Sequence, residues 1–236
     1  MRADVRHQMK QDPIRNATVH WTVEHKDSIL RYGAIAIVLV IASIAAWAYL
    51  NHREELASVE LNQAVRTYTE PIRPPGMPET PEFSSFASAA DRAKKAHELF
   101  EAVASKYSST RSGDMARYFA GITAGETNDT ATAERELKQI ANGSNHDLAA
   151  LGQMALAALY RNSGRDALAI ELYKKLTERP ANTVSRQTAQ IELASVYISK
   201  QQPLEARKIY EQLQKDNPNT DFAKMAAAKL EEMSKP

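Results

Sequence analysis

Leucine, alanine and tyrosine residues recur along the chain at an interval of 37 residues. Leu156, Ala157 and Tyr160 are each followed at this interval by a residue of the same type. The interval also joins Ala169 to Ala206, Tyr173 to Tyr210 and Leu176 to Leu213. Two earlier segments continue the series at 36 or 37 residues, through Gly121, Ala133, Leu137 and Ile140 and through Ala96, Phe100 and Val103. The four copies must stack on one another, because one copy cannot bury its apolar face alone.

The residue types within each copy favour helices. The chain has only 8 glycines, and alanine, glutamate, lysine and leucine are abundant in the repeats. Ala157 lets two helices approach closely, Tyr160 can fill the space between neighbouring copies, and Pro180 ends the second helix of its pair. We therefore expect the recurring residues to form the core, and residues from Phe222 to Met233 to form the terminal helix that caps the stack.

These residues resemble the tetratricopeptide repeat, a helix pair with the pattern W-x2-L-G-x2-Y, then A-x3-F, then P. The last copy matches through Leu193-Ala194-x2-Tyr197, Ala206-x3-Tyr210 and Pro218, and the copy before it through Leu156-Ala157-x2-Tyr160, Ala169-x3-Tyr173 and Pro180. The tryptophan position holds Arg117, Gln153 and Gln190. The resemblance covers the chain from roughly residue 52 to its end. It implies an all-α solenoid of four helix pairs plus a capping helix, and a role in binding proteins.

Residues 33–50 form an apolar run, GAIAIVLVIASIAAWAYL, with no charged residue over eighteen positions. At about 1.5 Å per residue a helix of this length covers about 27 Å, close to the roughly 30 Å of a bilayer hydrocarbon core. Tyr32 at one end, and Trp47 and Tyr49 at the other, occupy positions where aromatic rings prefer the membrane interface. The run predicts a single transmembrane helix, with a buried core helix as the alternative.

The residues that flank this run bear on processing and orientation. A leader of residues 1–32 and an apolar run longer than about 15 residues favour an uncleaved anchor over a signal peptide. The leader carries six Lys and Arg, whereas residues 51–70 carry only Arg53 and Arg66. Among the twenty residues nearest the run on each side, the difference narrows to three against two. The positive-inside rule favours a cytoplasmic basic leader, with the domain after the span on the opposite side of the membrane.

Beyond the run, a cluster of prolines divides the chain. Residues 51–70 carry apolar side chains at three- and four-residue spacing, which predicts a helix that continues from the span and serves as the first repeat helix. Five of the ten prolines lie between residues 71 and 81, so we expect a connector over residues 71–87. A tetratricopeptide-repeat-like helical domain follows over residues 88–236, with Ser84, Ser85 and Ser88 as candidate N-caps of its first helix.

The sequence contains no pattern that predicts catalysis. A net charge of +1 lacks the basic excess that nucleic-acid binding requires. The absence of cysteine excludes disulfides, zinc-thiolate sites and cysteine nucleophiles. The patterns HExxH, GxSxG, GxxxxGK[ST] and GxGxxG do not occur. We expect a protein that is not an enzyme and has no catalytic residue, no metal ligand, no cofactor and no nucleic-acid partner.

The candidates for function are the non-repeating residues on the first helix of each pair, because these helices line the concave face of such a superhelix. Apolar side chains recur there, and flexible thioethers adapt to partners of varied shape. The sequence predicts a groove for a peptide or a partner helix, with burial of these residues against one another as the alternative. The groove residues are Met115, Tyr118, Ile122, Leu151, Met154, Arg161, Ile191 and Ile198.

The order of leader, span and repeat domain resembles the YfgM-type ancillary subunits of the bacterial Sec translocon. The resemblance rests on layout and repeat phase. It implies a single-pass protein of the bacterial plasma membrane with a periplasmic tetratricopeptide-like domain. Its partners would be translocon subunits, periplasmic chaperones or exported chains, and the lipid bilayer through residues 33–50. The implied function is an adaptor that links translocated chains to periplasmic folding factors. The alternative is a structural assembly factor of another envelope complex, for division, secretion or outer-membrane assembly.

Overall fold

A computed structural model describes residues 26–77 and 85–235. The chain divides into two structural units, residues 1–52 and residues 53–236. Of the predicted basic leader, residues 1–25 lie outside the described residues, as do residues 78–84 of the predicted connector.

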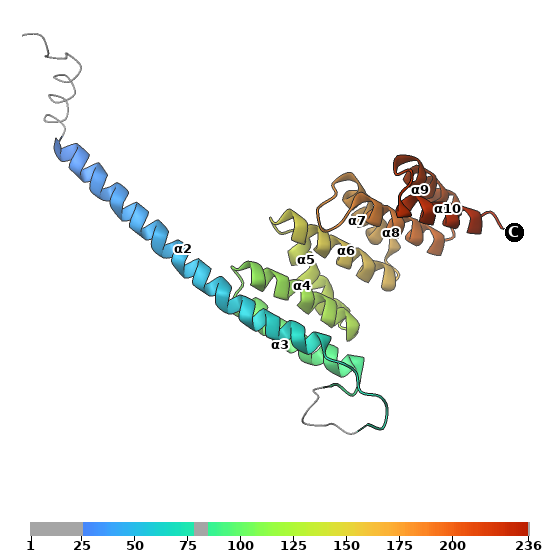
Figure 1. Cartoon of the computed structure of the whole chain (residues 1–236), viewed down its shortest axis with the longest axis horizontal. Helices are drawn as coiled ribbons and strands as arrows, with labels where there is room; N and C mark the ends of the chain where they lie inside the picture. Colours follow the sequence, from blue (N-terminus) through green and yellow to red (C-terminus); the bar gives the residue numbers. More distant parts are fainter. Residues whose placement is uncertain (1–25, 78–84, 236) are drawn as a thin grey trace, which may run out of the picture. The chain divides into compact units, whose positions relative to one another are not determined.

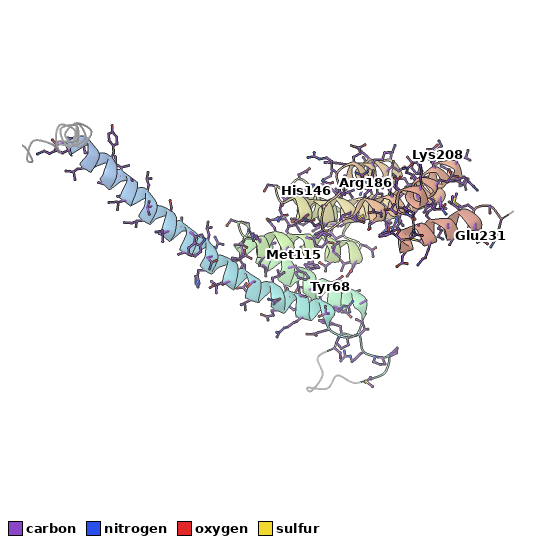
Figure 2. All side chains as sticks on the ribbon, turned by 45° about the horizontal axis from the view of Figure 1, so that its top comes forward. Tyr68, Met115, His146, Arg186, Lys208 and Glu231 are labelled. Atoms are coloured by element: carbon purple, nitrogen blue, oxygen red, sulfur yellow. The ribbon has the colours of Figure 1, made fainter. Side chains whose placement is uncertain are left out.

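Helix α2 (Lys26–Thr69) supplies the described part of the first unit, up to His52. Every side chain from Gly33 to Leu50 is exposed (Figure 2). The hydroxyl of Ser43 donates to the carbonyl of Leu39 at 2.7 Å, so this polar group is satisfied within the helix itself. By length and composition alone, α2 is long and apolar enough to cross a membrane.

The second unit consists of helices that follow one another in sequence order (Figure 1). After residues 53–69 of α2 come α3 (Ala89–Lys106), α4 (Arg111–Glu126), α5 (Thr130–Ala141), α6 (His146–Asn162), α7 (Asp166–Glu178), α8 (Arg186–Ser199), α9 (Pro203–Asp216) and α10 (Asp221–Glu232). From α3 onward each helix contacts the next, and α4 also contacts α6. Across residues 26–77 and 85–235 the elements are helices, apart from an isolated bridge between Ile72 and Phe86. Four helix pairs and a terminal helix confirm the predicted all-α solenoid.

The turn inside each of the last three pairs repeats one backbone geometry. Asn128, Gly164 and Gln201 have φ angles of 65°, 72° and 58°, in the left-handed region. The next residue donates its N–H to the last turn of the preceding helix: Asp129 to Ala124 O at 2.9 Å, Arg165 to Tyr160 O at 2.8 Å and Gln202 to Tyr197 O at 2.8 Å. These positions are 36 and 37 residues apart, so the backbone has the same period as the sequence.

Small and aromatic residues at the repeat positions form the core, as the sequence predicts. Ala157, Ala194 and Leu213 have 0% of their surface exposed, and Tyr173 has 1%. Leu213 shares a cluster with Ala226 of α10, so the terminal helix covers the end of the stack. Tyr197 is an exception. It packs against two core clusters, but its side chain is only partly buried.

The first pair, formed by residues 53–69 of α2 and by α3, has a separate core. Ala57 and Ala64 belong to one cluster with Phe100, whose ring stacks on that of Phe119 with centroids 5.1 Å apart. Two backbone hydrogen bonds join the ends of the connector, where it leaves α2 and approaches α3. Phe86 donates its N–H to Pro71 O at 3.0 Å, and its carbonyl accepts from Arg73 N at 2.8 Å.

Polar contacts join the two helices of the first pair to each other and to α4. Glu54 accepts from the N–H groups of Arg111 at 2.8 Å and Ser112 at 3.2 Å, and from the Ser112 hydroxyl at 2.7 Å. A carboxylate from α2 therefore satisfies N–H groups that the first turn of α4 leaves free. Glu60 accepts from Lys106 Nζ at 2.6 Å and from the hydroxyl of Tyr107 at 2.8 Å.

Candidate protein-binding site

The predicted groove residues lie on the first helices of three successive pairs. Met115, Tyr118 and Ile122 lie on α4, Leu151, Met154 and Arg161 on α6, and Ile191 and Ile198 on α8. All are partly buried except Ile198, which is 42% exposed. Figure 2 marks Met115 on α4, within the repeat domain. Three helices thus carry apolar side chains that are neither fully buried nor fully free.

Most of these side chains rest against the main core. Tyr118, Ile122, Leu151 and Met154 pack on one core cluster, and Ile191 packs on the cluster at the end of the stack. Burial raises the pKa of the Tyr118 hydroxyl, so this side chain stays neutral at ordinary pH. The core therefore holds these residues in place while part of each stays accessible, a property suited to a preformed binding surface.

Arg161 differs from its neighbours because it forms an ion pair. Its Nη1 lies 2.7 Å from Glu192 Oε2, which joins α6 to α8. A second ion pair occupies the tryptophan position of the α4/α5 pair, where Arg117 Nη1 lies 2.9 Å from Glu136 Oε2. In the α6/α7 pair the same position holds Gln153, which donates to the carbonyl of Ala141 on α5 at 3.1 Å. At both positions a polar side chain that bonds α5 stands in place of the tryptophan.

A pocket of about 390 Å³ lies between α4, α5 and α6, and we name it the α4/α6 pocket. Its lining residues are Gly121, Ile122, Gly125, Glu126, Asn128, Thr130, Leu137, Ala155, Ala158, Leu159, Asn162 and Ser163. The volume lies within the range of about 300–1,000 Å³ that is typical of ligand-binding pockets. One predicted groove residue, Ile122, is among the lining residues, so the pocket and the predicted groove overlap at α4.

The rim of this pocket carries a positioned carboxylate. Glu126, the last residue of α4, accepts a hydrogen bond from the hydroxyl of Tyr68 at 2.5 Å. Burial and the Glu126 carboxylate together raise the pKa of Tyr68 to about 12, so the phenol stays protonated and remains a donor at neutral pH. Both side chains belong to the second unit, where Tyr68 also contacts the rings of Phe100 and Phe119.

Sequence reasoning missed most of this pocket. Ile122 was predicted from its apolar character, but Gly125 and Ala155 were not, because small residues give no sign of an open space. One signal was present in the sequence. Gly125 occupies the repeat position that Arg161 and Ile198 hold in the next copies, so the side chain is missing at this position in one copy only.

Within residues 26–77 and 85–235, no group of three His, Asp or Glu side chains could hold a metal ion. Paired helices with repeating turns and a shared core define a helical-repeat scaffold, a class of fold that typically serves protein interaction and not catalysis. The model of the tetratricopeptide repeat-like domain family matches residues 20–235. The chain therefore belongs to the tetratricopeptide repeat-like domain family.

A comparison with solved structures agrees with this assignment. The fold is similar to the crystal structure of nearly identical tetratricopeptide-repeat-like repeats from Podosopora anserina, described as those of a kinesin light chain. The TM-score is 0.56 at 19% identity, over 77% of this chain and 86% of that chain. At this identity the likeness concerns the fold alone. A comparison with curated protein sequences gives no match.

Proposed function

We propose that this protein is a membrane-anchored adaptor at the bacterial protein-export machinery, which links translocated chains to periplasmic folding factors. The observation that carries the proposal is the row of accessible apolar side chains on α4, α6 and α8, held in place by the core beneath them. A scaffold of this family binds other proteins through such surfaces.

The anchor follows from the first part of α2. Eighteen successive residues, from Gly33 to Leu50, expose their side chains, and the run contains no charge. Water would have to solvate this apolar surface at a large cost in free energy, whereas lipid tails solvate it without that cost. With Tyr32, Trp47 and Tyr49 near its ends, the helix has the length and the interfacial side chains of a span.

Orientation is tested first. A reporter enzyme that is active only after export, fused after Pro236, should be active in bacterial cells, and a reporter active only in the cytoplasm should be inactive. The expectation rests on the six Lys and Arg of the leader. The reverse result would overturn the periplasmic adaptor proposed here.

Partner binding is tested by crosslinking from the groove. A photoreactive amino acid at Ile191 should trap translocon subunits, exported chains or periplasmic chaperones in living cells. The variant Ile198→Glu should reduce this yield severalfold, because Ile198 is an accessible apolar member of the row. Leu204→Glu on α9 is the matched control, since Leu204 is 71% exposed and lies outside the row.

The alternative predicts a different result. A structural assembly factor of another envelope complex would copurify with one stoichiometric complex, and Ile198→Glu would leave that complex intact. Equal crosslinking in both variants, together with such a complex, would replace the adaptor proposal by the assembly role.

A further inference from the structure

We propose that the α4/α6 pocket receives a bulky apolar side chain of a partner peptide that stands next to a lysine or arginine. This inference rests on the proposed function, because it names the chemistry of the segment that the protein-binding site takes. The pocket differs from the equivalent interface of the next two repeats, where an ion pair fills the space, and its rim carries a carboxylate.

The α4/α6 and α6/α8 interfaces carry different side chains at equivalent repeat positions. At α6/α8, Arg161 and Glu192 face each other as an ion pair, 2.7 Å apart. Their counterparts at α4/α6, shifted by 36 and 37 residues, are Gly125 and Ala155, and both line the pocket. The space that two long side chains fill at one interface is therefore open at the other.

The lining of the pocket suits an apolar side chain. Ile122, Leu137 and Leu159 line it with apolar side chains, and Ala155 and Ala158 contribute only methyl groups. A Cβ added at Gly125 would meet Leu159 Cδ1 at 3.8 Å and Ala133 Cβ at 3.9 Å, both ordinary contacts, so a side chain can begin here without a clash. An apolar floor in an open pocket gains free energy when an apolar side chain displaces water from it.

The rim of the pocket carries a negative charge. Glu126 is the charged residue among the lining residues of this pocket. The α5 N-terminus also reaches the rim at Thr130, but its positive end is capped by the Asp129 carboxylate, which accepts from Thr132 N at 3.0 Å. The Glu126 carboxylate therefore makes the rim negative and complements a cation next to the apolar anchor.

The test uses the full chain in nanodiscs of neutral phosphatidylcholine and three fluorescein-labelled peptides with Gly-Ser flanks. The first peptide has the core Leu-Leu-Lys-Arg, the second Ala-Ala-Lys-Arg and the third Leu-Leu-Glu-Glu. Fluorescence anisotropy should detect binding of the first peptide, with at least about tenfold weaker binding of the other two. Empty nanodiscs correct for insertion of the peptides into lipid.

Two double variants then test the pocket. Gly125→Arg with Ala155→Glu copies the ion pair of α6/α8 into the pocket, and should weaken binding of the first peptide at least about tenfold. Lys208→Ala with Glu205→Ala on α9 is the control, which removes an exposed ion pair outside the groove and the pocket and should leave this affinity in place. Circular dichroism and the melting temperature establish that both variants fold. Unchanged binding of the first peptide to Gly125→Arg with Ala155→Glu, the filled variant, would overturn the proposal.

The remaining outcomes separate this inference from the proposed function. If Ile198→Glu abolishes binding of the first peptide while the filled variant retains it, the groove is used and the α4/α6 pocket is not. If the peptide with the core Leu-Leu-Glu-Glu binds as tightly as the peptide with the core Leu-Leu-Lys-Arg, the proposed complementarity of charge is wrong. If none of the peptides binds, the inference fails, whereas the crosslinking from Ile191 still decides whether the chain acts as an adaptor.

Discussion

The first helix pair and the last two pairs of the second unit differ in their contacts. The last two pairs meet through buried residues of the repeat, such as Tyr173, Leu176 and Leu193, with the Arg161–Glu192 ion pair beside them. The first pair also has a buried core, but it relies on carboxylates as well, with Glu54 on the N-terminus of α4 and Glu60 on Lys106 and Tyr107.

This difference explains why the repeat pattern weakens toward its beginning. Packing of small and aromatic residues requires the same residue types in each copy, whereas hydrogen bonds from long side chains can join helices whose sequences have diverged. The first pair therefore follows the architecture of the repeat with only part of its sequence pattern, through Ala96, Phe100 and Val103. The two kinds of junction should respond differently to mutation, salt and pH.

The largest effect should come from the packed end of the stack. Leu213→Ala should lower the free energy of unfolding by about 2–5 kcal/mol, because it leaves a cavity at a site with 0% exposure. Urea unfolding followed by circular dichroism gives the value, and hydrogen exchange should show the loss concentrated in α9 and α10. Leu168→Ala, at a site that is 42% exposed, is the control and should cost much less. Equal costs for the two would contradict the buried end of the stack.

The next effect tests the close approach of α4 and α5. Gly121→Ala should destabilise by about 1–3 kcal/mol, because its Cβ would lie 2.7 Å from Leu137 Cγ. Gly125→Ala, one helical turn further along, should stabilise by about 0.5–1 kcal/mol, because it removes backbone freedom from the unfolded chain without a clash. Melting temperatures should therefore move in opposite directions, and a loss in both variants would argue against the open space beyond Gly125.

The polar junction of the first pair should show a smaller, salt-sensitive effect. Glu54→Gln should lower the free energy of unfolding by about 1–2 kcal/mol. It removes the negative charge of the carboxylate that accepts hydrogen bonds from Arg111 and Ser112 in the first turn of α4. Hydrogen exchange at residues 111–113 should speed up, and high salt should reduce the difference from the parent protein. Glu211→Gln, at an exposed position on α9, is the control. A salt-independent loss would mean that packing, and not charge, makes this contact.

The smallest effect concerns pH. Hydrogen bonds from Lys138 and Arg165 lower the pKa of Glu134 to about 2, from an ordinary value of 4.5. Since the folded pKa is depressed, the stabilisation is complete above pH 4.5 and is lost as the pH falls from 4.5 toward 2. Solvent screening limits it to about 1 kcal/mol. The drop in melting temperature between pH 7 and pH 3 should be smaller in Glu134→Gln, and an identical drop in both proteins would refute the assignment.

Sequence reasoning was most successful where a property depends on local spacing. The 37-residue interval predicted the helix pairs, and the recurring Ala157, Ala194 and Leu213 are buried as expected. It was less successful for Tyr197, which packs against two core clusters but is only partly buried. The groove residues were identified by type and phase, but their role in binding stays a prediction, since burial against the core is compatible with either role.

The sequence by itself determined the helical period, the paired helices and the eighteen-residue apolar run, because each follows from residue types at regular spacing along the chain. Only the tertiary structure decided which interface is open. Gly125 and Ala155 leave a pocket, whereas Arg161 and Glu192 at the same repeat positions meet in an ion pair. That outcome depends on which side chains of different helices come within a few ångströms of each other, and packing determines this distance.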